Sequence, residues 1–259
     1  MHVYIYDTFV SDKKYINQVA RVETRITDLG LNGKIVRMGL ISSVSSAIEN
    51  EIKKGANTII AVGDKQIFSQ AVNAMAQLLA RESIGKSVPL GFIPVGKKDL
   101  LIADSLGIGS AELACDILSQ RRIEALSLGQ ANNSYFLFSA TVPTEHTTIE
   151  IDENYSIEIK EPGEIGVINL AVGFTLPQSA KTDQADSSLE LVIKTAQGKK
   201  YLPGKRGAGD QSVFAFNKLR IINKKYPILL DGAKNLTSPV DIQVAPMKIS
   251  LIVGKNRQF

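Results

Sequence analysis

A short segment of the chain has the residue order of a phosphate-binding turn. The β-branched run 58–62 ends at Gly63 and is followed at once by a helical pattern of apolar residues. A strand that ends in glycine and leads directly into a helix points backbone N–H groups at one place, where they can hold phosphate. Asp64 and Lys65 stand in this turn, where further glycines are expected. The sequence therefore predicts a nucleotide-site scaffold that has lost most of its glycines.

Asp64 and Lys65 act in opposite directions on a phosphate group. A carboxylate in a partly desolvated turn repels phosphate, whereas a lysine attracts it as a point charge. A second pair of lysines, Lys97 and Lys98, follows Gly96 and offers further anion contacts. Both features also have a simpler interpretation, namely an ordinary strand–turn–helix and two solvated charges at a loop tip.

Two kinds of periodicity divide the chain. The first half alternates apolar strands with amphipathic helices, which predicts a parallel sheet covered on both faces. The expected strands are His2–Tyr6, Lys34–Met38, Asn57–Val62, Val88–Ile93 and Ile123–Leu128. After Gly129 the pattern changes to short alternating runs separated by turns, which predicts an antiparallel, sandwich-like β structure. Its expected strands include Tyr135–Thr141, Val240–Val244 and Lys248–Val253. We therefore predict an α/β domain over residues 1–129 and a β-rich domain over residues 130–259.

The composition excludes several classes of protein. The single cysteine, Cys115, rules out a disulfide framework and is expected in the core. The only two histidines, His2 and His146, cannot support a zinc site without cysteines or clustered acids. No secretory signal is visible and no apolar run is long enough to cross a bilayer, so we expect a soluble, cytoplasmic protein.

Charge is unevenly distributed along the second half. Residues 194–225 hold nine basic side chains against Asp210 alone, and residues 150–164 hold six acidic side chains against Lys160. This pattern suggests one face suited to an anionic surface, lipid or nucleic acid, and the simpler interpretation is a solvated strand face plus a loop. Few aromatic residues lie among the basic ones, so there is no specific signal for nucleic acid.

The order of the two halves resembles that of the diacylglycerol kinases and bacterial lipid kinases, a family that includes sphingosine and ceramide kinases. The family has Gly-Gly-Asp-Gly-Thr after a strand; here Gly63 matches the first glycine and residues 64–67 replace the rest. A second family motif is matched at its two ends by Pro89–Gly96 and Leu106–Ile108. Its phosphate-facing middle is replaced by Lys97–Leu100.

A loop in the second half resembles the family's Asp-x-x-Asp-Gly-x-Leu-Asp segment. Here the segment reads Asp-Gln-Ala-Asp-Ser-Ser-Leu-Glu over residues 183–190. In some bacterial members this loop holds a structural magnesium ion. The resemblance therefore implies Asp183, Asp186 and Ser188 as metal ligands.

Asp231 and Ala233 stand where the family has Asp-Gly-Glu. The resemblance makes Asp231 the candidate catalytic residue, while Ala233 replaces the Glu that is regarded as the general base. A methyl group cannot accept the proton of a substrate hydroxyl, and general-base help is typically worth ~10²–10⁴-fold in rate. The simpler interpretation of Asp231 is a turn aspartate that caps its own backbone.

The resemblance implies ATP- and Mg²⁺-dependent phosphoryl transfer to a lipid hydroxyl such as that of diacylglycerol, in a cleft lined by Gly63, Gly96 and Asp231. Because the residues that position phosphate and the base are replaced, we expect a catalytically weak or inactive lipid-kinase-like protein, a pseudoenzyme that binds a nucleotide or another anion at the inner face of the membrane. Two alternatives stay open. One is a working kinase that uses Lys97, Lys98 and Asp231, and the other is a non-enzymatic module that docks on a membrane or a partner.

Overall fold

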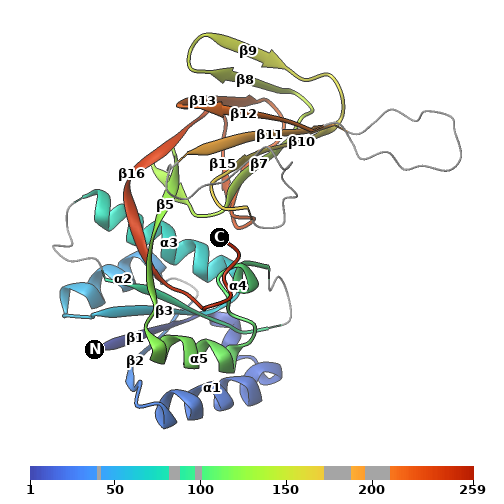
Figure 1. Cartoon of the computed structure of the whole chain (residues 1–259). Coiled ribbons are helices and arrows are strands. Elements are labelled where there is room, and N and C mark those ends of the chain that lie inside the picture. The colour runs from blue at the N-terminus through green and yellow to red at the C-terminus, as the bar shows by residue number, and fades with distance from the viewer. Residues whose placement is uncertain (40–41, 82–87, 97–100, 172–187, 196–210) are drawn as a thin grey trace, which may run out of the picture. The chain divides into compact units, whose positions relative to one another are not determined.

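The computed structural model describes residues 1–39, 42–81, 88–96, 101–171, 188–195 and 211–259 (Figure 1). The chain divides into two compact units. Unit 1 consists of residues 1–126 and 246–259, and unit 2 of residues 127–245. The sequence-based division assigned all of 130–259 to the second domain. The last residues belong to unit 1 because strand β16 (Val240–Ile252) continues beyond unit 2 and pairs in parallel with β4 (Leu90–Pro94).

The core of unit 1 is the predicted parallel sheet. Strands β1 (His2–Tyr6), β2 (Gly33–Arg37), β3 (Thr58–Gly63) and β4 lie in the order β2-β1-β3-β4, and β16 follows β4. All residues of β3 and β4 are buried. Continuous apolar, β-branched runs of this kind suit strands that are covered on both faces.

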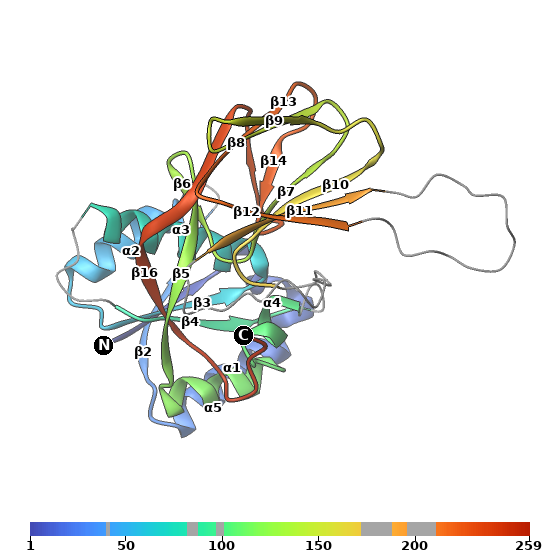
Figure 2. The ribbon, with the colours of Figure 1, turned by 45° about the horizontal axis from the view of Figure 1, so that its top comes forward.

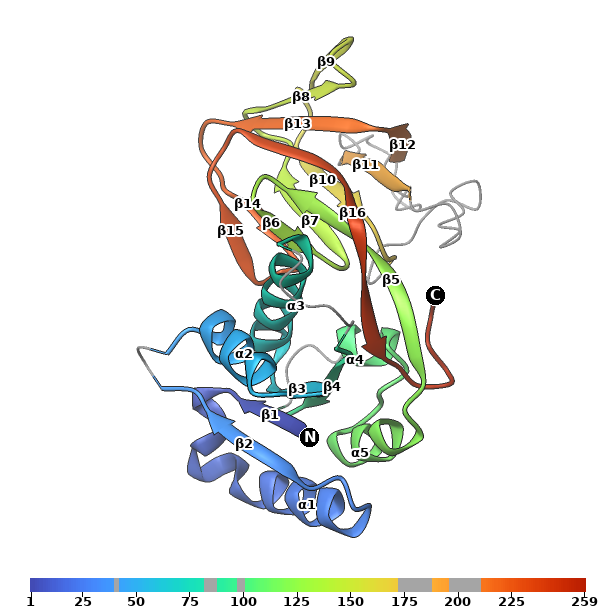
Figure 3. The same cartoon turned by 90° about the vertical axis from the view of Figure 1, so that its left-hand side faces the viewer.

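Helices cover both faces of this sheet. Helix α1 (Ile16–Asp28) packs beside α5 (Ala111–Gln120) on one face, and α2 (Val44–Lys53) packs beside α3 (Lys65–Ala80) on the other (Figures 1 and 3). The short helices are η1 (Thr8–Ser11), η2 (Lys13–Tyr15) and α4 (Leu101–Ser105). The predicted alternation of strand and helix is confirmed.

The strand order fixes where a ligand is expected. After β1 the chain continues to β2 on one side of it and then returns to form β3 on the other side. The carboxyl ends of β1 and β3 therefore flank the point where the order reverses, and open α/β sheets bind ligands at such points. The predicted turn at Gly63 lies at this point.

Unit 2 contains two antiparallel sheets, the first of which is joined to the sheet of unit 1 through β16 (Figure 2). One has the order β16-β13-β8-β9 and the other the order β12-β11-β10-β7-β14-β15, while β5 pairs with β16 and β6. Apolar side chains from both sheets form its core, among them Phe136, Ile165, Leu191 and Ile221. The strands are β5 (Ile123–Ala131), β6 (Ser134–Phe136), β7 (Ser139–Pro143), β8 (Thr147–Ile151), β9 (Tyr155–Glu158), β10 (Gly163–Ile168), β11 (Leu189–Thr195), β12 (Gln211–Phe216), β13 (Lys218–Asn223), β14 (Ile228–Leu230) and β15 (Lys234–Leu236). The predicted β-rich second half is confirmed.

Two details of unit 2 differ from the sequence-based expectation. The run Tyr135–Thr141, expected as one strand, is divided into β6 and β7, because backbone N–H groups between them donate to the carboxylate of Asp231. The runs 240–244 and 248–253, expected as two strands, are replaced by the single strand β16. The local pattern of apolar residues predicts neither the division of the first run nor the joining of the other two.

Candidate functional site

The carboxyl ends of β1 and β3 meet at Asp7 and Gly63. The Asp7 backbone N–H donates to the Val62 carbonyl at 2.9 Å, which holds the two strand ends together. Gly63 has φ 153°, and a Cβ there would lie 2.8 Å from the Asp7 Cβ and 2.9 Å from Cγ2 of Ile67. Only glycine fits such a backbone and such a close approach. Asp7 was not predicted as a site residue, although its position directly after a parallel strand is a usable signal.

Asp64 caps the helix that follows this turn. It is the residue that precedes α3, and its Oδ1 accepts the backbone N–H of Gln66 at 2.8 Å. A carboxylate is a favourable cap because it satisfies a free N–H group and complements the positive end of the helix. Those N–H groups are also the ones that would hold a phosphate. The chain therefore supplies its own anion at the start of α3.

Two acidic side chains, Asp7 and Asp64, lie close together at this turn. Burial raises the pKa of the Asp7 carboxyl above its ordinary value; the Thr8 hydroxyl, which donates to it at 3.1 Å, opposes this rise, and the charge of Asp64 adds to it. Lys65, the first residue of α3, is partly buried and supplies a positive charge nearby in the sequence. Two neighbouring acids make this end of the sheet a poor environment for a further anion.

Gly96 lies beside Gly63, as the sequence predicted. The Val95 N–H donates to the Gly63 carbonyl at 2.8 Å, and the Gly96 N–H donates to Oε1 of Gln18 at 3.2 Å. Gly96 has φ 105°, and the Tyr15 hydroxyl oxygen lies 3.7 Å from the position of a Cβ there. Sequence reasoning missed Tyr15 and Gln18 as site residues because both belong to the pattern around the first helix. The predicted contacts Lys97 and Lys98 lie outside the described residues.

Asp231 is buried in unit 2, with only 6% of its surface exposed. Its Oδ2 accepts the N–H of Leu137 at 2.9 Å, and its Oδ1 accepts those of Phe138 at 2.8 Å and Ser139 at 3.0 Å. Burial raises the pKa of Asp231 to about 6, while the three N–H groups act against that rise. One interpretation expected Asp231 to cap its own turn. Its carboxylate instead accepts N–H groups of a segment more than 90 residues away. This geometry favours a structural role.

The predicted magnesium ligands are mostly outside the described residues. Asp183 and Asp186 lie there, and Ser188 is exposed just before β11. Within the described parts of the chain, no group of three or more His, Cys, Asp or Glu side chains is arranged to hold a metal ion. The magnesium site stays a prediction.

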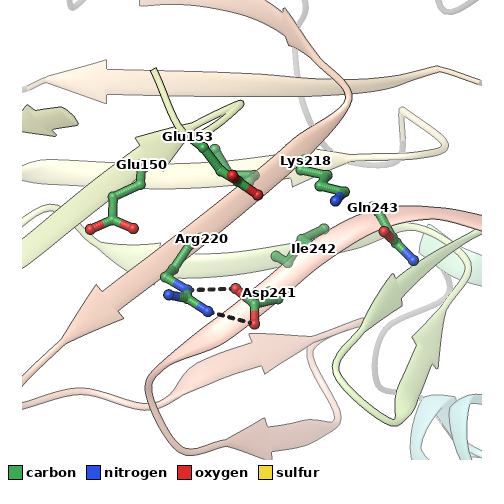
Figure 4. Close-up of a pocket in the computed structure, with 8 residues that line it drawn as sticks. Glu150, Glu153, Lys218, Arg220, Asp241, Ile242 and Gln243 are labelled. Carbon is green, nitrogen blue, oxygen red and sulfur yellow. Dashed lines mark hydrogen bonds and ion pairs between the residues drawn. The ribbon is translucent and has the colours of Figure 1, made fainter. Parts of the chain in front are cut away.

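A hollow of about 290 Å³ lies on the sheet of β8, β13 and β16 in unit 2. It is lined by both acidic and basic side chains, and none of the predicted site residues contributes to it. Arg220 forms two hydrogen bonds with Asp241, from Nε to Oδ1 at 2.6 Å and from Nη2 to Oδ2 at 3.1 Å (Figure 4). The labelled lining residues are Glu150, Glu153, Lys218, Arg220, Asp241, Ile242 and Gln243.

The sheets bring parts of the acidic and the basic run together. Arg220 on β13 is the register partner of Glu150 on β8, and Lys194 on β11 is the partner of Glu164 on β10. Charges that are separated along the sequence are thus neighbours in the folded unit. Lys199, Lys200, Lys205 and Arg206, the middle of the basic run, lie outside the described residues. In the parts of the chain that the structure describes, no helix has the length and apolar character needed to cross a membrane.

The sequence matches no family model and no curated protein. Solved structures do match, among them three from Bacillus anthracis str. Sterne that are described as diacylglycerol kinases, two of them provisionally. The first has a TM-score of 0.71 at 13% identity and covers 99% of this chain and 97% of that one. The second has a TM-score of 0.73 at 14% identity, and the match covers 99% of this chain and 97% of that one. The third has a TM-score of 0.72 at 13% identity, and the match covers 99% of this chain and 98% of that one. The similarity shows the fold.

Proposed function

Because this chain has the fold of the diacylglycerol-kinase-like lipid kinases, we propose that it is a lipid-kinase-like protein that binds an anionic ligand and transfers phosphate from ATP slowly or not at all. One observation carries the second part of the proposal, the slow or absent transfer of phosphate. The carboxylate of Asp64 caps α3 at the place where nucleotide phosphates would accept N–H groups.

The residues at this end of the sheet do not fit the phosphates of ATP. Asp7 lies against Gly63 and its carboxyl interacts with the charge of Asp64, so two acids stand at the turn in which phosphate would have to be held. Enzymatic phosphoryl transfer depends almost entirely on positioning and on stabilisation of negative charge. Carboxylates at this point oppose both requirements.

The second half supports the same proposal. Ala233 has no group that accepts a proton, and the Asp231 carboxylate is already engaged by three backbone N–H groups. A general base must reach the hydroxyl from which it takes the proton. Neither residue therefore replaces the lost base. Because the fold is that of lipid kinases, we take the ligand to be a lipid at the inner face of the membrane.

Replacing Asp64 by Ser tests the proposal through ATP binding. Serine caps a helix about as well as aspartate but carries no charge. Removal of one repulsive charge near 4 Å is worth about 1 kcal/mol in water and more in a partly buried turn. We therefore expect wild-type protein to bind ATP weakly by calorimetry, with or without Mg²⁺, and Asp64→Ser to bind it about fivefold to tenfold more tightly.

Asp28→Ser is the matched control. It removes the same charge at the last residue of α1, about 20 Å along the helix from Tyr15. ATP affinity should not change in this variant. Tight ATP binding by the wild-type protein that weakens in Asp64→Ser would contradict the proposal.

A further inference from the structure

A lysine and a serine from distant parts of unit 2 are in direct contact. Lys234, the first residue of β15, donates from Nζ to Oγ of Ser134 on β6 at 2.8 Å. Ser134 is buried and Lys234 is partly buried. Lys234 directly follows Ala233, the residue that stands where the related family has its general base. The contact thus adjoins the predicted catalytic turn in the sequence.

The charge of Lys234 has no counter-ion in the part of the chain that the structure describes. Other cations of the molecule lie against acids, such as Lys34 at 2.7 Å from Glu51 and Arg257 at 2.8 Å from Glu124. Asp231 is only three residues away, but its carboxylate is turned toward the amides of residues 137–139. Burial accordingly lowers the pKa of Lys234, and no acid of a described segment raises it again. A partly buried cation without a counter-ion is costly, and a bound anion removes that cost.

The pair offers donors to an incoming group. An ammonium group has three N–H donors, and one of them is used by Ser134. The Ser134 oxygen accepts that bond, so the O–H proton of Ser134 is available to donate. The Ser134 hydroxyl makes no other hydrogen bond to a described residue. The fitting ligand is therefore a group that only accepts. The terminal oxygens of a phosphate monoester provide three strong acceptors and nearly two negative charges.

We infer that Lys234 and Ser134 form a binding site for a phosphate monoester, an inference that rests on the proposed function because it names the anion that the protein binds. A monoester matches the two remaining N–H donors and the one O–H donor, whereas a phosphodiester has fewer terminal oxygens and a single charge. The group is carried either by a lipid headgroup or by a small soluble molecule.

The experiment measures binding to three probes. Glycerol 3-phosphate, followed by calorimetry, tests the soluble source. Phosphatidylcholine vesicles that contain phosphatidic acid test the lipid source, and vesicles of equal charge that contain phosphatidylglycerol, a diester, test for non-specific attraction. We expect binding to at least one monoester probe and clearly weaker binding to the diester vesicles.

Variants then assign the binding to this pair. Lys234→Met should weaken monoester binding about tenfold or more, and Ser134→Ala about threefold, because each removes donors to a charged acceptor. Lys234→Arg, which keeps the charge, should retain part of the affinity. Lys160→Met removes an exposed lysine of the same unit that lies outside the basic run 194–225, and should leave binding unchanged. Circular dichroism confirms that each variant is folded.

Three outcomes overturn the inference, and they differ in what they leave standing. If the wild-type protein binds a monoester and folded Lys234→Met and Ser134→Ala bind it equally well, the site lies elsewhere and the proposed function is untouched. If the wild-type protein binds neither monoester probe, the inference fails together with the anion-binding part of the proposed function. Vesicle binding that is equal for diester and monoester, with no binding of glycerol 3-phosphate, also contradicts it.

Discussion

Replacement of Asp231 by alanine is expected to lower the free energy of unfolding by about 3 kcal/mol or more. The change leaves the N–H groups of Leu137, Phe138 and Ser139 without their acceptor, and each buried, unsatisfied donor costs about 1–3 kcal/mol. Asp231→Asn keeps one acceptor oxygen and should lose less. Because the chain contains no tryptophan, chemical denaturation followed by circular dichroism is the suitable measurement.

Asp152→Ala is the matched control for this prediction. Asp152 has φ 50°, close to the 49° of Asp231, and it also accepts backbone N–H groups, from Asn217 at 3.0 Å and Lys218 at 2.8 Å. Solvent reaches these groups, so water can replace the lost acceptor. We expect a loss of about 1 kcal/mol or less. Equal losses for the two variants would contradict the role assigned to burial at Asp231.

The pH dependence of stability provides an independent check on Asp231. Its pKa in the folded state, about 6, lies above the ordinary value of 3.8, so the folded protein binds more protons between these values than the unfolded chain does. The contribution of Asp231 to stability is therefore complete below about pH 4 and decreases as the pH rises through about 6. The difference between the wild-type protein and Asp231→Ala should be largest near pH 4.

Replacement of Gly63 by alanine is expected to destabilise unit 1 by about 3 kcal/mol. The added Cβ would lie 2.8 Å from the Asp7 Cβ and 2.9 Å from Cγ2 of Ile67, at φ 153°, so steric overlap and backbone strain add together. Denaturation followed by circular dichroism, with hydrogen exchange to identify unit 1, measures the effect.

Gly30→Ala separates these two causes. Gly30 also has a positive φ, 65°, but nothing lies within 4 Å of the position of its Cβ. Only backbone strain remains, and the expected loss is about 1 kcal/mol. A Gly63→Ala variant no less stable than Gly30→Ala would show that the contact between Asp7 and Gly63 is looser than described.

Much of the fold follows from local sequence because its causes are local. Apolar, β-branched runs of the β3 kind form strands of a covered parallel sheet, and a 3.6-residue period forms the helices between them. The turn at Gly63 and its approach to Gly96 were also predictable, since parallel strand ends meet at one edge of the sheet. Asp7 could have been found by the same reasoning.

The rest depends on contacts between residues far apart in the sequence. The division of the run 135–141 into two strands is caused by Asp231, more than 90 residues later. The contact of Lys234 with Ser134 spans 100 residues. The acidic and basic runs looked like separate surfaces, but strand pairing places Glu150 opposite Arg220. No local pattern encodes these pairings.

Phosphate transfer tests the central claim most directly. Purified wild-type protein is incubated with radiolabelled ATP, Mg²⁺ and diacylglycerol in mixed micelles, and the labelled phospholipid is counted, with an active lipid kinase as the control for the assay. Because the proposed function has Asp7 and Asp64 oppose phosphate binding and gives neither Ala233 nor Asp231 the role of a base, the account predicts no product above the protein-free level. Robust turnover that is abolished in folded Asp231→Asn would contradict it and would show a working kinase with a divergent site.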